Sequence, residues 1–278
     1  MSIREILIAE NSYPKRTPPW VLRAGVQLGE ILEARVSVAI WQVHRRKIAN
    51  FLADKLVGAN RLIAEENQLS QNDTDLLIEE FRDAVPDHMR GEEHVFKNGA
   101  MVFPREMCRH ARLYDLVIVP HYDDADAISV AADIIFESGR PILLLPEMGR
   151  DELALDTIVI GWDGGRACVR AMVDALPLCA IAREVLVVTI VNEKPLDIND
   201  TLKPLERYLR RHGIEPKMVE HPACDADAGE ALKRYCETRG ADMLVMGAYG
   251  HSRAREFILG GATDTILTAP GLPVILSH

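Results

Sequence analysis

The chain has 278 residues, of which 48% are hydrophobic and 27% are charged, and its formal net charge at pH 7 is −10. This length accommodates two ordinary domains, because single hydrophobic cores seldom grow beyond about 250–300 residues. The acidic balance argues against nucleic-acid binding, since such proteins concentrate Lys and Arg on one face. An anionic ligand therefore needs a local site built from backbone dipoles.

The N-terminal segment carries Arg4 and Glu5 in front of an apolar run that is too short for a signal peptide or a membrane span. We expect a cytoplasmic protein that does not bind a membrane. The cysteines form no C-x-x-C pair, so we expect core residues and neither a disulfide framework nor a metal site. They are Cys108, Cys168, Cys179, Cys224 and Cys236.

In the first half of the chain, short β-rich runs predict strands at 6–9, 35–40, 93–96, 115–120 and 141–145. A helix is predicted after Pro18 and Pro19. Its apolar residues recur with helical spacing and predict a buried stripe of Val21, Ala24, Gly25, Leu28, Ile31 and Leu32. The charged stretch 51–83 predicts an extended helical pair between the second and third strands.

The second half repeats the pattern, with strands predicted at 157–162, 185–191, 216–221, 242–247 and 273–277. Strands that alternate with helices indicate crossover connections and a parallel sheet. Asp227 followed by Glu230 predicts the start of a helix, and Gly240 predicts its end.

The two halves align with one another over three strands. Residues 6–9 match 158–161, residues 114–120 match 241–247, and residues 139–144 match 271–276. An internal repeat of this length favours two similar domains, 1–148 and 149–278, over a single large one. The Pro- and Gly-containing stretch 146–152 is typical of a linker.

The strongest local motif is MGAYGHSRAREFILGGAT, from Met246 to Thr263, which follows a predicted strand and leads into a short helix. Glycines allow close approach of the backbone to a ligand, and the free N–H groups at a helix start attract phosphate oxygens. By themselves, the glycines are equally compatible with tight turns.

The spacing Gly247-x-x-Gly250, nine residues, Gly260 resembles that of the nucleotide-binding universal stress proteins, as do the strand end Trp162–Gly165 and the final strand with its G-x-P-V-I-L sequence. The resemblance covers 153–278 and, more loosely, 1–148. It implies an α/β fold of two tandem doubly wound domains, each with a five-stranded parallel sheet in the order 3-2-1-4-5. It also implies an intrachain pseudo-dimer, with a homodimer as a further possibility.

In this family a nucleotide lies at the carboxyl ends of strands 1 and 4, where the strand order reverses. Carried onto this chain, the resemblance implies ATP, ADP or AMP, with or without Mg²⁺, near Asp163, Val191, Met246 and Gly247. Its phosphates would contact Gly250, Arg253, Gly260, Gly261, Ala262 and Thr263. Many ATP-binding members have Ser or Thr where this chain has Gly261, and losing a hydroxyl donor weakens binding by on the order of 1 kcal/mol.

Structural explanations compete with these assignments. Asp163 is also suited to capping the following helix, Val191 and Met246 to the core, and Arg253 to a solvated loop. In the first half, Asn11 replaces Asp163, and Asp123, Asp124 and Asp126 fall where phosphates would lie. Because carboxylates repel phosphates, we expect this half to have lost nucleotide binding.

The resemblance predicts a stress-response regulatory protein that binds an adenine nucleotide in its C-terminal domain and acts through an unidentified protein partner. Slow ATP hydrolysis is compatible with this prediction, but the sequence has no G-x-x-x-x-G-K-[ST], G-x-S-x-G or H-E-x-x-H motif. The alternatives are a nucleotide-independent scaffold or signalling protein of the same fold, which the departure at Gly261 favours, and an adenylyl-transfer enzyme. The latter would normally carry a His-rich or Ser-Gly-Gly signature after the first strand, and residues 162–166 have neither.

Overall fold

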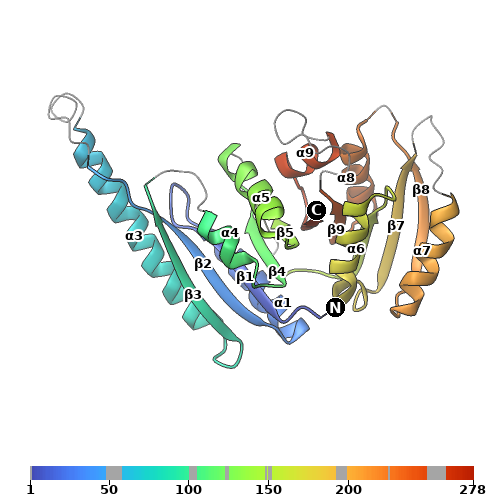
Figure 1. The fold of residues 1–278 in the computed structure, drawn as a ribbon, viewed down its shortest axis with the longest axis horizontal. Coiled ribbons are helices and arrows are strands. Elements are labelled where there is room, and N and C mark those ends of the chain that lie inside the picture. The colour runs from blue at the N-terminus through green and yellow to red at the C-terminus, as the bar shows by residue number, and fades with distance from the viewer. Residues whose placement is uncertain are drawn as a thin grey trace.

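The computed structural model describes residues 2–47, 58–99, 105–122, 125–147, 149, 152–191, 199–224, 226–248 and 261–278. These residues form one ten-stranded sheet with helices on both faces (Figure 1). In the part of the chain that the structure describes, no helix has both the length and the hydropathy to cross a membrane.

The first half contains five strands and four described helices. In chain order they are β1 (Glu5–Asn11), α1 (Pro19–Leu32), β2 (Arg35–Val43), α3 (Ala59–Ala84), β3 (Arg90–Asn98), α4 (Arg105–Ala111), β4 (Leu116–Pro120), α5 (Ala125–Ser138) and β5 (Ile142–Leu145).

The second half repeats the alternation. Its elements are β6 (Thr157–Gly161), α6 (Arg166–Cys179), β7 (Glu184–Val191), α7 (Asn199–Arg211), β8 (Pro216–Pro222), α8 (Ala228–Arg239), β9 (Met243–Gly247), α9 (Gly261–Thr268) and β10 (Val274–Ser277). Each of the ten strands predicted from the sequence is present.

The strand order is β3-β2-β1-β4-β5-β10-β9-β6-β7-β8. Within each half this is the predicted order 3-2-1-4-5, and the paired strands of a half are parallel. The halves join where β5 and β10 pair antiparallel, with Leu143 opposite Ile275. The predicted fold class is therefore present, and the two halves join in a continuous sheet.

The apolar side chains divide into two layers, one on each face of the sheet. One layer contains buried residues of α1, α3, α6 and α7, and the other contains buried residues of α4, α5, α8 and α9. Both layers run through both halves, so each half is doubly wound. Four of the five cysteines are buried, as predicted, and Cys224 is exposed.

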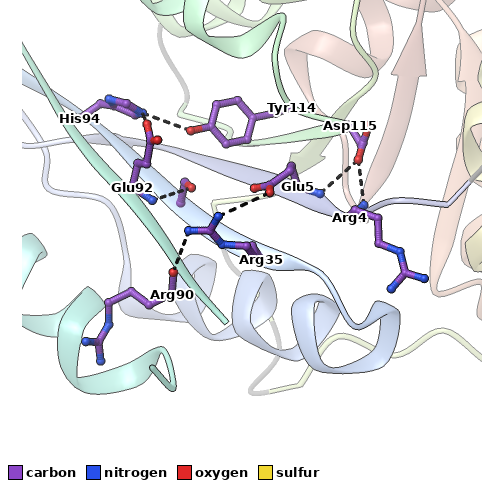
Figure 2. A network of polar contacts seen from close by, with 9 residues as sticks. Arg4, Glu5, Arg35, Arg90, Glu92, His94, Tyr114 and Asp115 are labelled. Carbon is purple, nitrogen blue, oxygen red and sulfur yellow. Dashed lines mark hydrogen bonds and ion pairs between the residues drawn. The ribbon is translucent and has the colours of Figure 1, made fainter. Parts of the chain in front are cut away.

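The duplication extends to single hydrogen bonds. Asp115 Oδ2 accepts from the backbone nitrogens of Arg4 and Glu5 at 2.8 and 3.1 Å (Figure 2). Asp242, its counterpart in the alignment, accepts from the backbone nitrogen of Thr157 at 2.9 Å. The two aspartates tie the start of strand 4 to the start of strand 1 in their respective halves.

Figure 2 shows further polar contacts at the same amino-terminal edge of the first half. Arg35 at the start of β2 pairs with Glu5, and its side chain donates to the Arg90 carbonyl at 3.3 Å. His94 contacts the Tyr114 hydroxyl at 3.1 Å, and burial, followed by the nearby His110, lowers its pKa. This network aligns the beginnings of the strands and lies at the edge opposite the candidate ligand site.

One local prediction, the burial of Ile31, differs from the structure. Ile31 is 41% exposed, because α1 turns the row of Leu22, Gly25 and Gly29 toward the sheet. A Cβ on Gly25 would lie 2.4 Å from Ile8 Cδ1, so this row approaches β1 more closely than a larger side chain allows. The described part of the charged stretch 51–83 contains the helix α3, and residues 51–57 lie outside the described residues, so the predicted helical pair stays a prediction.

Candidate functional site

The carboxyl ends of β6 and β9 form the topological switch point of the second half. The two strands pair directly, with Ile160 opposite Val245. Helix α6, which follows β6, packs on one face of the sheet. Helix α9, which comes after β9, packs on the other face, next to α8. Doubly wound sheets bind their ligands at this kind of position.

Asp163 lies two residues after the end of β6, next to Trp162, and is exposed. Its Oδ1 accepts from the backbone nitrogen of Gly165 at 2.7 Å, and Gly164 between them has a φ of 73°. Gly165 is the N-cap of α6. The carboxylate therefore closes the turn before α6 without capping the helix, whose N-cap makes no side-chain hydrogen bond, and it remains accessible at the edge of the sheet.

Gly247 ends β9 and lies against the first turn of α6. A Cβ at this position would be 2.3 Å from the Cys168 nitrogen and 2.5 Å from the Ala167 carbonyl carbon. The requirement for glycine is thus explained by helix packing without a ligand. The same contact brings the end of β9 next to the turn that carries Asp163.

Val191 and Met246 differ in exposure. Val191 is the last residue of β7, is half-buried, and pairs with Pro222 of β8. Met246 is 5% exposed and belongs to the core layer beneath α8 and α9. Met246 therefore contributes mainly to packing, whereas Val191 lies at the carboxyl edge, where a base would be framed.

The start of α9 brings Gly261, Ala262 and Thr263 together. Gly261 is exposed, and among the described residues a Cβ there would meet only Asp227 Cβ, at 3.8 Å. The backbone of Ala262 packs against Gly229 of α8, where a Cβ would lie 2.6 Å from the Ala262 carbonyl oxygen. Thr263 is buried.

Asp227 lies between the starts of α8 and α9. As the sequence predicted, it caps α8, accepting from the backbone nitrogens of Gly229 and Glu230 at 2.8 and 3.2 Å. It also accepts from Thr265 Oγ1 of α9 at 3.2 Å. The N-termini of α8 and α9, each with a partial positive charge, thus lie on either side of one carboxylate. Their positive charges would attract an anion, and the negative charge of Asp227 partly offsets this attraction.

Cys168 is the thiol nearest this edge. Its Sγ donates to the Gly161 carbonyl oxygen at 3.1 Å, and burial raises its pKa to about 12. A protonated, buried thiol is neither a nucleophile nor a good metal ligand. Within the described ranges, His, Cys, Asp and Glu side chains form no group of three that could hold a metal ion.

Three predicted site residues, Gly250, Arg253 and Gly260, lie outside the described residues. The described ones divide into two groups. Four lie at or next to the strand ends, namely Asp163, Val191, Met246 and Gly247, and three lie at the start of α9, namely Gly261, Ala262 and Thr263.

The corresponding edge of the first half is closed by side chains. Thr17 and Tyr122 share a hydrogen bond of 2.7 Å between the loop after β1 and the loop after β4, and both residues are buried. Ser12 shares a hydrogen bond of 2.6 Å with Ser70 of α3. Asp123 and Asp124 lie outside the described residues, as does the side chain of Asp126.

Sequence reasoning did not identify Glu10, which lies near the end of β1 and aligns with Trp162. Its side chain is buried, and its Oε2 has no hydrogen-bond partner among the described residues. Burial and the charge of Glu80, opposed by Arg16, raise its pKa to about 8. The sequence signal that could have identified Glu10 is an acidic residue that directly follows the apolar run of β1.

Comparison with known proteins agrees with this architecture. Residues 154–278 match the sequence profile of the universal stress protein family. A universal stress protein of Synechocystis is 27% identical over 145 residues, which cover 51% of this chain and 48% of that relative. The chain thus matches about half the length of this curated relative.

Two solved structures share the fold over nearly the whole chain. A universal stress protein from Archaeoglobus fulgidus has 14% identity and a TM-score of 0.68, with 98% of each chain covered. A protein from Pseudomonas aeruginosa, described as of the same family, has 14% identity and a TM-score of 0.59, with 99% of this chain and 93% of its own covered. Residues 154–278 therefore match the universal stress protein family, and the chain as a whole shares the fold of these two solved structures.

Proposed function

We propose that the C-terminal half binds an adenine nucleotide. In this proposal the bound nucleotide regulates the binding of a partner protein in the cytoplasm during a stress response. The observation that carries this proposal is the start of α9 beside the start of α8 at the carboxyl edge of the second half, within the part that matches the family. Backbone N–H groups at helix starts favour phosphate oxygens. Asp163 would face the ribose or the base.

In this proposal the first half, residues 1–148, is a pairing and scaffolding domain without a nucleotide. The hydrogen bond between Thr17 and Tyr122 supports this role, because it spans the two loops between which a nucleotide would lie. The second domain, residues 149–278, would then hold one nucleotide per chain.

The ligand is ATP, ADP or AMP, and Mg²⁺ would offset the repulsion between a polyphosphate and Asp227. Among the described residues, a Cβ at Gly261 meets only Asp227 Cβ, at 3.8 Å, so a serine side chain fits beside them without displacing their backbone. We therefore expect Gly261→Ser to tighten binding by about tenfold or more, because a hydrogen bond to a charged group contributes about 1.5–3 kcal/mol. No step of the proposed function requires a nucleophile, which agrees with the protonated Cys168.

The experiment is to denature freshly purified protein and to quantify any released nucleotide by chromatography and mass spectrometry. Titration calorimetry with ATP, ADP and AMP, with and without Mg²⁺, then gives the affinities. One nucleotide per chain, lost in Gly250→Asp and retained in the matched control Asp123→Ala, supports the proposal. A protein that is purified empty and takes up none of the three nucleotides overturns it in favour of a nucleotide-independent scaffold.

A further inference from the structure

Helix α3 has a second apolar face in addition to the one it buries. Its buried face includes Leu77 and Phe81, which belong to the core. On another side, Leu62, Leu69 and Leu76 are 53%, 49% and 46% exposed. They are spaced seven residues apart, so they form a single row, here called the leucine row, along almost four turns of the helix.

The topologically equivalent helix of the second half has no such row. Helix α7 makes the same crossover in 13 residues, and α3 takes 26. The leucines of α7 at positions 202, 205 and 209 all pack in or against the core. The fold therefore does not require the extra length of α3, nor its exposed leucines (Figure 1).

Acidic residues border the leucine row on both sides. The flanking positions three and four residues after each leucine are Glu65, Glu66, Asn72, Asp73, Glu79 and Glu80. Three of these carboxylates have arginine partners in the chain: Glu65 with Arg61, Glu66 with Arg45 and Glu80 with Arg16. Asp73 and Glu79 add negative charge beyond these pairs.

We propose that the leucine row of α3 docks a basic amphipathic helix of a partner protein, with apolar residues at heptad spacing and Lys or Arg beside them. An exposed apolar row framed by charge is typical of helix-to-helix recognition, in which flanking charges select the partner. A second copy of this chain is disfavoured, because either antiparallel or parallel pairing would bring two acidic borders together. An anionic membrane is disfavoured because its headgroups would repel the acidic borders of the leucine row.

The test uses the full chain and a synthetic peptide of three heptads, with leucine at positions a and d and lysine at positions e and g. A peptide of the same composition in scrambled order is the control for non-specific attraction to an acidic protein. Fluorescence anisotropy should show binding of the ordered peptide and much weaker binding of the scrambled one. Added salt should weaken the interaction, because exposed charges contribute to it.

Matched variants assign the binding to the leucine row. Leu69→Gln should weaken peptide binding about tenfold or more, as expected for the central residue of a small interface. Leu113→Gln is the control, since Leu113 is 80% exposed and lies outside α3. Glu79→Lys should weaken binding at low salt and have little effect at high salt, and circular dichroism verifies that each variant is folded.

Equal binding of the ordered and scrambled peptides, or unchanged affinity in Leu69→Gln, overturns the proposal. Analytical ultracentrifugation tests the other occupant. A dimer of the wild-type chain that Leu69→Gln converts to monomer would assign the leucine row to self-association and would also overturn it. The nucleotide titrations described above are independent of all these outcomes.

Discussion

Replacement of Gly247 by alanine tests whether the packing of β9 against α6 requires a glycine at the first position of the glycine motif. The added Cβ would lie 2.3 Å from the Cys168 nitrogen and 2.5 Å from the Ala167 carbonyl carbon, both backbone atoms of α6. The end of β9 or the start of α6 must therefore move. We expect a loss of about 1–3 kcal/mol in the free energy of unfolding, the usual cost of overpacking a tight contact.

Gly261→Ala is the matched control, because a Cβ there meets its nearest neighbour at 3.8 Å. Its free energy of unfolding should stay within about 0.5 kcal/mol of the wild-type value, as for most surface substitutions. Urea titrations followed by circular dichroism and by tryptophan fluorescence measure the free energy of unfolding of both variants. Trp162 is a local fluorescence probe, because it lies next to the turn between β6 and α6. A Gly247→Ala protein as stable as the wild type would refute the packing explanation.

The remaining predictions concern Glu10 and the paired aspartates. The pKa of Glu10 in the folded protein, about 8, lies above its ordinary value of 4.5. The contribution of Glu10 to the free energy of unfolding is therefore complete below pH 4.5 and is lost as the pH rises toward 8. The loss is at most about 1.4 kcal/mol per pH unit. Glu10→Gln should flatten this decline in urea titrations between pH 5 and pH 8.5, and equal slopes for the two proteins would contradict the assignment. Asp115→Ala and Asp242→Ala should each lower the free energy of unfolding by about 1–2 kcal/mol, because each leaves strand-end N–H groups without a partner. The two losses should add in the double variant, since the sites lie in different halves, and a neutral effect of either single variant would contradict the role of that aspartate.

Most of the fold was predictable because its signals are local. Short β-rich runs predicted all ten strands, and Asp227 and Gly240 predicted both ends of α8. The alignment of Asp115 with Asp242 correctly paired residues that form equivalent hydrogen bonds. The exposure of Ile31 was not predictable in the same way, because the orientation of α1 depends on the approach of Gly25 to β1.

The candidate site was predictable only in part. The resemblance selected residues of the switch point, and the contribution of Gly250, Arg253 and Gly260 stays a prediction. The hydrogen bond of Thr17 to Tyr122 joins loops that are 105 residues apart in sequence, and no local pattern indicates such a contact.

Local sequence patterns thus determined the alternation of strands and helices, the duplication, and the positions where the chain lacks side chains. They did not determine the reason for each missing side chain. Gly247 has backbone atoms within 2.5 Å of where a Cβ would be, whereas the described atom nearest a Cβ on Gly261 is Asp227 Cβ, at 3.8 Å. This difference arises from the packing of α6 on β9 and of α9 beside α8, contacts between segments distant in sequence that exist only once the sheet has assembled.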